Sequence, residues 1–159
     1  MINFLEIAEH CPEYVTDESL SYWAYKYCTQ IKDRQEIRKY ITTQWESYYY
    51  CTEVKDRQEI RKHITSSSYT CRYCRLVKDR KAVRKYITSS EDAYFYCKDV
   101  KDRPSIRKHI TESYHAYEYC KNIKNRPEIR KLMTWEDYCY FLIGWLPNKI
   151  NTILNGNKP

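Results

Sequence analysis

The sequence predicts an all-α protein, a solenoid of stacked two-helix repeats with a 23-residue period. Each copy carries a version of Tyr-Cys-x-x-Val-Lys-Asp-Arg-x-x-Ile-Arg-Lys-x-Ile-Thr, as at 96–111. Apolar residues within a copy recur at three- and four-residue steps, the spacing of one face of an α-helix. Units of this size bury an apolar face only by stacking on their neighbours. The period itself is set by five cysteines, Cys28, Cys51, Cys74, Cys97 and Cys120.

The repeats divide the chain into three parts. Residues 1–19 are predicted to form a degenerate, acidic N-terminal capping repeat, and residues 135–159 to form C-terminal capping helices. Between them, residues 20–134 hold the five copies, 20–42, 43–65, 66–88, 89–111 and 112–134.

Two helices are expected in each copy. In the first copy Ala24, Cys28 and Ile31 share one helical face, and Ile37 and Ile41 stand four residues apart on a second one. We expect helices of about twelve and about eight residues to fill the period.

The joints between helices show capping patterns. Asp33 followed by Glu36 predicts an N-cap for the shorter helix, because a carboxylate there accepts exposed backbone N–H groups. Pro104 and Pro127 suit the first turn of that helix, where a missing N–H is harmless. Further caps are expected at Asp56, Asn125, Thr43, Thr88 and Thr134.

The C-terminal region is apolar around the whole helix at 138–146. A terminal helix that faces water should not be apolar on all sides. We favour a tail helix at 148–155 that folds back over it, with Ile150, Ile153 and Leu154 as the covering face. The alternative is a second chain, giving a homo-oligomer joined through residues 138–154.

The repeat resembles the short tandem helical repeats of uncharacterised proteins of large bacteriophages and giant viruses. The resemblance covers residues 20–134 and is best at 23–28, WAYKYC, and at 126–129, RPEI. This chain departs from the pattern by carrying Cys where Ala is common and Asp in place of Gly in the turn. The resemblance implies a viral origin and a helical solenoid, and it implies no reaction.

Composition excludes several classes of function. Two glycines in 159 residues leave no phosphate-binding loop of the Walker or dinucleotide type. Enzymatic activity would need unlike residues converging in one cleft, whereas this chain repeats the same residues at wide intervals, so we expect no catalytic centre and no cofactor. No apolar run approaches the roughly 20 residues of a membrane helix, and no leader is apparent. We expect a soluble cytoplasmic protein.

The eight cysteines are not expected to form disulfides. Equivalent positions of stacked helices lie about 8–10 Å apart, beyond the roughly 4.4–6.8 Å Cα separation of a disulfide. The periodic cysteines therefore fit small buried side chains. Cys71 and Cys74 form one C-x-x-C without a second pair, so no metal site is predicted.

Basic residues occupy four positions of every copy and account for 20 of the 28 Lys and Arg residues. One interpretation is a structural ladder, in which Arg of one copy pairs with the capping Asp or Glu of the next and lays its stem over a Tyr ring. The other interpretation is a track of basic side chains that binds nucleic-acid phosphates, in which successive copies stand about 10 Å apart.

Charge is concentrated in the third copy. Residues 66–88 carry a net charge of +6, whereas residues 1–19 carry −5 and the whole chain +7. An evenly spread phosphate track should not show this bias, but a protein that docks on one acidic patch should. The candidate partner-binding residues are Arg72, Arg75, Lys78, Arg80, Lys81, Arg84 and Lys85, with Tyr69, Trp45 and Trp23 as an exposed aromatic row.

The function that follows is recognition without catalysis. The leading hypothesis is a viral protein that binds an acidic surface of a host or viral protein through a basic, Tyr-rich face centred on the third copy, and inhibits or retargets it. Two alternatives stay open: a sequence-tolerant nucleic-acid binder that stacks Tyr on bases, and a structural homo-oligomer.

Overall fold

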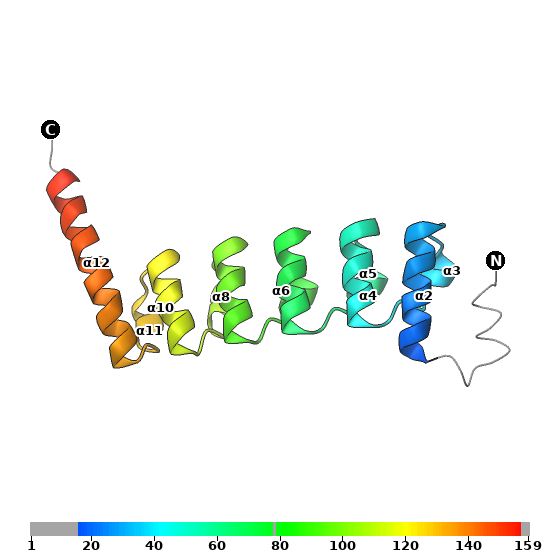
Figure 1. The fold of residues 1–159 in the computed structure, drawn as a ribbon, viewed down its shortest axis with the longest axis horizontal. Helices are drawn as coiled ribbons and strands as arrows, with labels where there is room; N and C mark the ends of the chain where they lie inside the picture. Colours follow the sequence, from blue (N-terminus) through cyan, green and yellow to red (C-terminus); the bar gives the residue numbers. More distant parts are fainter. Residues whose placement is uncertain (1–15, 78, 157–159) are drawn as a thin grey trace. The chain divides into compact units, whose positions relative to one another are not determined.

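The computed structural model describes residues 16–77 and 79–156, with side chains as far as residue 147. In this part of the chain it contains eleven α-helices, one π-helical segment and no strand (Figure 1). The predicted all-α class is therefore confirmed. None of the described helices is both long and apolar enough to cross a membrane.

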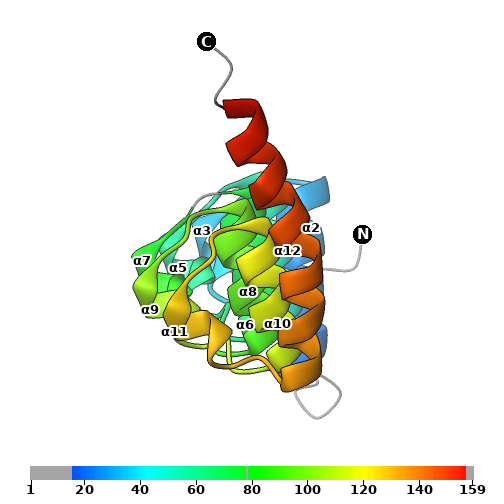
Figure 2. The same ribbon diagram turned by 90° about the vertical axis from the view of Figure 1, so that its left-hand side faces the viewer.

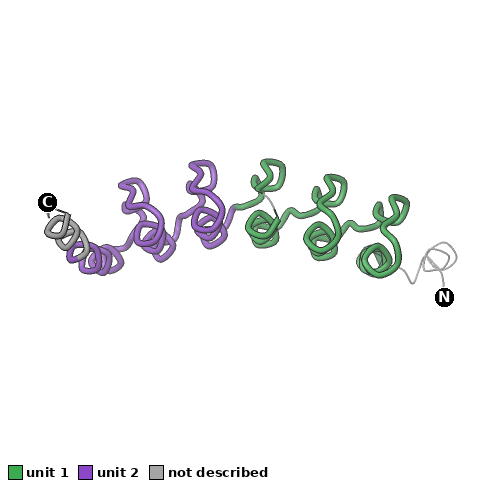
Figure 3. The backbone as a smooth tube through the Cα atoms, turned by 90° about the horizontal axis from the view of Figure 1, so that it is seen from above, with its two compact units in different colours: residues 1–87 green, residues 88–159 purple. Residues whose placement is uncertain are grey.

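The chain divides into two compact units, residues 1–87 and 88–159 (Figure 3). Unit 1 contains α2 (Asp17–Gln30), α3 (Gln35–Arg38), α4 (Gln44–Tyr49), the π-helical segment η2 (Tyr50–Val54), α5 (Gln58–Arg61), α6 (Ser67–Leu76) and α7 (Lys81–Arg84). Unit 2 contains α8 (Ser90–Asp99), α9 (Pro104–Arg107), α10 (Ser113–Asn122), α11 (Pro127–Arg130) and α12 (Trp135–Gly156). In both units a long helical stretch alternates with a four-residue helix.

The short helices lie on one side of the long ones within each unit. In unit 1 α3, α5 and α7 lie along the same side of α2, α4 and α6 (Figure 3). In unit 2 α9 and α11 take this position beside α8 and α10 (Figure 2). Side chains of long and short helices are therefore presented on different faces of a unit.

The short helices have four residues, so the predicted length of about eight is wrong. In α3 the backbone N–H of Tyr40 bonds to the carbonyl of Ile37 at 3.1 Å, and that of Ile41 to Arg38 at 3.0 Å. These three-residue steps tighten the last turn and end the helix. Ile41 lies beyond the helix but is still buried, as its spacing from Ile37 predicted.

The core includes the isoleucines or valine and the periodic cysteine of every copy, and one periodic tyrosine in each copy from the second to the fifth. Tyr50 and Tyr73 in unit 1, and Tyr96 and Tyr119 in unit 2, have no exposed surface. The five periodic cysteines are free of disulfides and buried, as predicted: Cys28, Cys51, Cys74, Cys97 and Cys120. Burial raises the pKa of the Cys51, Cys74 and Cys97 thiols to about 11, which keeps them protonated.

The tyrosine that precedes each periodic cysteine also marks where a long helix ends. The carbonyl of Tyr27 accepts the backbone N–H groups of both Ile31 and Lys32, at 3.0 and 3.1 Å. After α4 the same five-residue bond, from Lys55 to Tyr50 at 3.1 Å, closes the π-helical segment η2. The Tyr27 carbonyl thus accepts a second N–H in addition to the ordinary four-residue bond of the helix.

Capping differs in part from the prediction. Asp33 is not the N-cap of α3: that position is Arg34, and no side chain caps it. Ser89, not Thr88, caps α8 by accepting the N–H of Asp92 at 3.1 Å. As in α3, the N-caps of α5 and α11 are arginines, Arg57 and Arg126, instead of the predicted Asp56 and Asn125. Thr134 caps α12 as predicted, accepting the N–H of Asp137 at 3.3 Å. Thr43 stands at the N-cap of α4, but its hydroxyl accepts from Ser21 Oγ at 3.3 Å and makes no capping bond to the helix backbone.

α12 is one continuous helix from Trp135 to Gly156, so residues 148–155 do not fold back over residues 138–146. The favoured expectation of self-coverage is therefore wrong. Trp135, Tyr140 and Ile143 are each at least two-thirds exposed. The covering side chains named for that model, Ile150, Ile153 and Leu154, lie outside the described side chains, as do the N-terminal residues 1–15.

Candidate interaction surface

Asp33 is the centre of a cluster that joins two consecutive copies in unit 1. Its Oδ1 accepts hydrogen bonds from Arg38 Nη1 at 2.9 Å and Tyr50 Oη at 2.8 Å. Its Oδ2 accepts from Arg57 Nη2 at 3.0 Å, and Arg57 Nε donates to Tyr50 Oη at 3.0 Å. One carboxylate thus binds an arginine of its own copy, an arginine of the next copy and a buried tyrosine.

The pairing of one aspartate with two arginines recurs along the chain, although Arg80 Nε and Tyr73 Oη do not form the Arg–Tyr bond seen between Arg57 and Tyr50. Asp56 pairs with Arg61 and, at 3.1 Å, with Arg80 in unit 1. In unit 2 Asp102 pairs with Arg107 at 2.6 Å and Arg126 at 2.8 Å. The predicted structural ladder is therefore present, but its main pair joins Arg to the Asp of the preceding copy. In Arg57 and Arg126 the guanidinium also bonds to a Tyr hydroxyl instead of lying along the ring.

The protonation states of Asp33 and Tyr50 suit the hydrogen bonds of this cluster. Burial alone would raise the pKa of Asp33, but hydrogen bonds from Arg38, Tyr50 and Arg57 outweigh it and hold that pKa below its ordinary value. Burial and the hydrogen bond to Asp33 raise the pKa of Tyr50 to about 12. At neutral pH the carboxylate is therefore ionised and the phenol neutral, so each carries the form that the cluster needs.

Acid should weaken this cluster. Because the pKa of Asp33 is lower in the folded protein than in the unfolded chain, its contribution is complete above an unfolded pKa of about 4 and is lost as pH falls further. We expect the free energy of unfolding to drop more steeply below about pH 4 in the wild type than in Asp33→Asn. Urea unfolding at pH 7 and pH 3 measures the difference, and equal slopes would contradict it.

Two of the predicted partner-binding residues belong to this ladder. Arg80 is paired with Asp56, and Arg84 Nη1 bonds to Asp79 Oδ2 at 2.6 Å. Arg80 thus joins the third copy to the second, whereas Arg84 and Asp79 both belong to the third copy. Partner contact by Arg80 and Arg84 stays a prediction.

An aromatic cluster lies on the long helices of unit 1. The rings of Trp45 and Tyr49 on α4 are 4.5 Å apart between centroids, and Trp45 also meets Tyr69 of α6 edge-on at 6.1 Å. Tyr48 packs against both tyrosines, with its ring centroid 5.1 Å from that of Tyr49 and 5.4 Å from that of Tyr69. Tyr48 is buried, whereas Trp45 remains 50% exposed. A buried aromatic base thus supports an exposed indole.

Basic side chains adjoin this cluster on α6. Arg72 and Arg75 are exposed and stand three and six residues after Tyr69, on the outer side of the helix. Arg72 lies close enough to Tyr48 to lower its pKa, against the larger effect of burial, which raises it. We call Trp45, Tyr49, Tyr69, Arg72 and Arg75 the α4–α6 face.

The remaining predicted residues are placed elsewhere. Lys81 and Lys85 are exposed on or beside the short helix α7, and the Lys85 ammonium lies 4.8 Å from the Tyr86 ring. Trp23 on α2 is 49% exposed and contacts Tyr22 at 5.5 Å. Lys78 lies outside the described residues. The structure therefore separates the predicted set into two faces of unit 1.

Tyr48 and Tyr49 are the members of the cluster that sequence reasoning missed. The available signal is spacing: Tyr49 stands four residues after Trp45, so the two share a helical edge. The position of Tyr49 holds Lys26 in the first copy and Arg72 in the third. The repeat pattern therefore does not predict an aromatic residue there.

Comparison with known proteins adds no family to this description. No family model matches the chain, and no curated protein and no solved structure matches it.

Proposed function

We propose that the α4–α6 face binds an acidic patch of a partner protein, and that the protein works as a non-catalytic recognition molecule in the cytoplasm. The observation that carries this proposal is the half-exposed Trp45, held by two tyrosines beside the exposed Arg72. Trp, Tyr and Arg are the residues that most often dominate binding energy at protein interfaces. A ring already fixed by its neighbours loses little conformational entropy on binding.

A protein partner suits this surface better than nucleic acid does. The most regular arginines of the chain are occupied by Asp33, Asp56 and Asp102, so they do not form a free row of phosphate contacts. The rings of Tyr48 and Tyr49 pack on one another at 5.1 Å instead of standing apart to receive bases. Arg72 beside an indole fits a carboxylate-bearing protein surface.

The scaffold in this proposal is a solenoid of 23-residue two-helix repeats. Its support is that the Asp–Arg pair between consecutive copies recurs at that spacing within unit 1 and is found again within unit 2. The resemblance of residues 20–134 to helical repeats of large bacteriophages and giant viruses supports a host or viral protein as the partner, one that this protein inhibits or retargets.

Two variants on the α4–α6 face test the proposal. Trp45→Ala removes the indole and Arg72→Glu reverses the adjacent charge, so each should weaken partner binding by about 30-fold or more. The matched control is Lys98→Glu with Lys121→Glu, two exposed long-helix lysines of unit 2 at the repeat position of Arg75. Partners are captured from host lysate treated with nuclease, and their affinities are then measured with purified components.

The outcomes are distinct. The proposal predicts a protein retained by the wild type and by the control variant, and lost with Trp45→Ala and Arg72→Glu. Equal loss with the control variant would show that binding follows total charge. Loss of the signal on nuclease treatment would favour the nucleic-acid alternative, and capture of the chain's own second copy would favour the homo-oligomer.

A further inference from the structure

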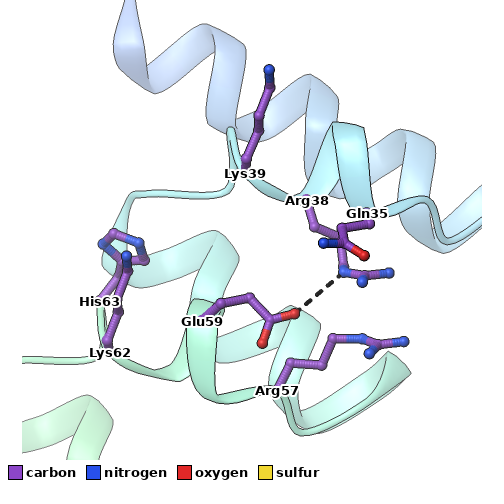
Figure 4. A pocket seen from close by; sticks show the side chains of 7 residues that line it. All are labelled: Gln35, Arg38, Lys39, Arg57, Glu59, Lys62 and His63. Carbon is purple, nitrogen blue, oxygen red and sulfur yellow. Dashed lines mark ion pairs between the residues drawn. The ribbon is translucent and has the colours of Figure 1, made fainter.

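A groove lies between the short helices α3 and α5 of unit 1. Its volume is about 490 Å³, and its lining includes Arg38, Lys39, Arg57, Glu59, Lys62 and His63 (Figure 4). Four of the seven lining side chains carry a positive charge at neutral pH, and Glu59 alone is negative. The groove is separate from the α4–α6 face, because the short and long helices form different sides of the unit.

Arg38 is the group that points to a ligand. Its side chain is only 8% exposed, and one nitrogen, Nη1, is bonded to Asp33. Its Nε is buried and has no hydrogen-bond partner. A buried N–H of a charged group without an acceptor is unfavourable, because the water it lost has not been replaced.

Glu59 lies opposite this nitrogen without satisfying it. Its Oε1 is 3.6 Å from Arg38 Nε, an ion pair too long for a hydrogen bond (Figure 4). The Glu59 side chain is 53% exposed, so it can turn toward solvent at little cost. The carboxylate thus marks the position where a more strongly bonded anion would lie.

The other side chains favour an anion with several oxygens. Arg57 is already bonded to Asp33, whereas Lys39 and Lys62 are exposed at the ends of α3 and α5. Burial and the neighbouring Lys62 lower the pKa of His63, so its ring is neutral at pH 7 and offers one donor and one acceptor. Donors on both short helices suit a phosphate, whose three terminal oxygens accept from different directions.

We infer that the α3–α5 groove binds the phosphate group of a small phosphorylated ligand, with Arg38 and Lys62 as its main contacts and Glu59 displaced by the anion. The groove falls within the range of about 300–1,000 Å³ that is typical of small-molecule sites, so it has room for an organic group attached to the phosphate. This inference is independent of the proposed protein partner.

Binding of pyrophosphate and AMP to the full-length protein tests the inference. Isothermal titration calorimetry at constant ionic strength gives the affinities of the wild type and three variants. Lys62→Glu removes an exposed contact, and Glu59→Gln removes the competing carboxylate. Lys55→Glu is the matched control, an exposed lysine of the same unit that does not line the groove.

We expect both probes to bind, Lys62→Glu to weaken them by about tenfold, Glu59→Gln to strengthen them, and Lys55→Glu to change little. Absence of binding, or equal weakening by Lys62→Glu and Lys55→Glu, would overturn the inference, because diffuse attraction acts on any lysine. Tighter binding of a single-stranded oligonucleotide than of AMP, lost equally with both lysine variants, would also overturn it in favour of a nucleic-acid surface.

Discussion

Replacing Tyr50 with alanine is expected to lower the free energy of unfolding by about 3–5 kcal/mol. Tyr50 has no exposed surface, so its whole ring contributes to the buried core. Its hydroxyl also joins Asp33 to Arg57, at 2.8 and 3.0 Å. The variant therefore loses buried apolar area and the bridge between two charged groups.

Two further variants separate these contributions. Tyr50→Phe keeps the ring but leaves Arg57 Nε without its acceptor, so we expect a smaller loss of about 1–2 kcal/mol. Tyr22→Ala, at an exposed position of α2, should change stability by less than about 1 kcal/mol. Urea unfolding followed by circular dichroism measures all three. A loss with Tyr50→Ala no larger than with Tyr22→Ala would show that this ring does not hold the copies together.

Replacing Asp102 with alanine is expected to lower the free energy of unfolding by about 3 kcal/mol. Arg107 and Arg126 both bond to this carboxylate, at 2.6 and 2.8 Å. Truncation leaves two partly buried guanidinium groups with only the exposed carboxylate of Glu128 as counter-charge, at 3.9 and 3.8 Å. Their mutual repulsion and lost solvation account for an effect larger than that of an ordinary surface ion pair.

The control for Asp102 is Glu136→Ala, an exposed acid in the first turn of α12, which should change stability by no more than about 0.5 kcal/mol. Both variants remove one negative charge from unit 2, so net charge is matched. Thermal and urea unfolding at pH 7 compare them directly. Similar values for the two variants would mean that the ladder contributes specificity of pairing without stability.

The helical alternation was predictable because it depends on local spacing. Ala24 and Cys28, four residues apart, define a buried helical face whatever lies beyond the copy. The length of the second helix was not predictable in the same way. Ile41 fits the helical spacing from Ile37 equally well in a continued helix and in the tight turn that the chain adopts.

The role of Asp33 required three dimensions. A carboxylate three residues before a glutamate favours a capping box on local grounds. Here a partner 24 residues away, Arg57, competes for the same carboxylate and is bonded to it. Local spacing relates Asp33 only to its neighbours along the chain. It therefore predicts a cap and does not identify Arg57 as the partner of this carboxylate.

The candidate surface was found in part. The charge of the third copy directed attention to Arg72 and Arg75, which do lie on one exposed face. The same count included Lys81 and Lys85, which stand beside a short helix on another side of the unit. Summing charge over a segment cannot distinguish the sides of a helix pair, and it cannot show that Arg80 is neutralised by Asp56.

The pairing of Arg57 and Arg80 with the aspartates of their preceding copies makes the second copy removable as a block. Deleting residues 43–65 would bring Arg80 to the position of Arg57, where Asp33 offers the same carboxylate. Tyr73 would likewise replace Tyr50. The chain can therefore lose this 23-residue module while the new junction keeps an Asp, a Tyr and an Arg that complement one another.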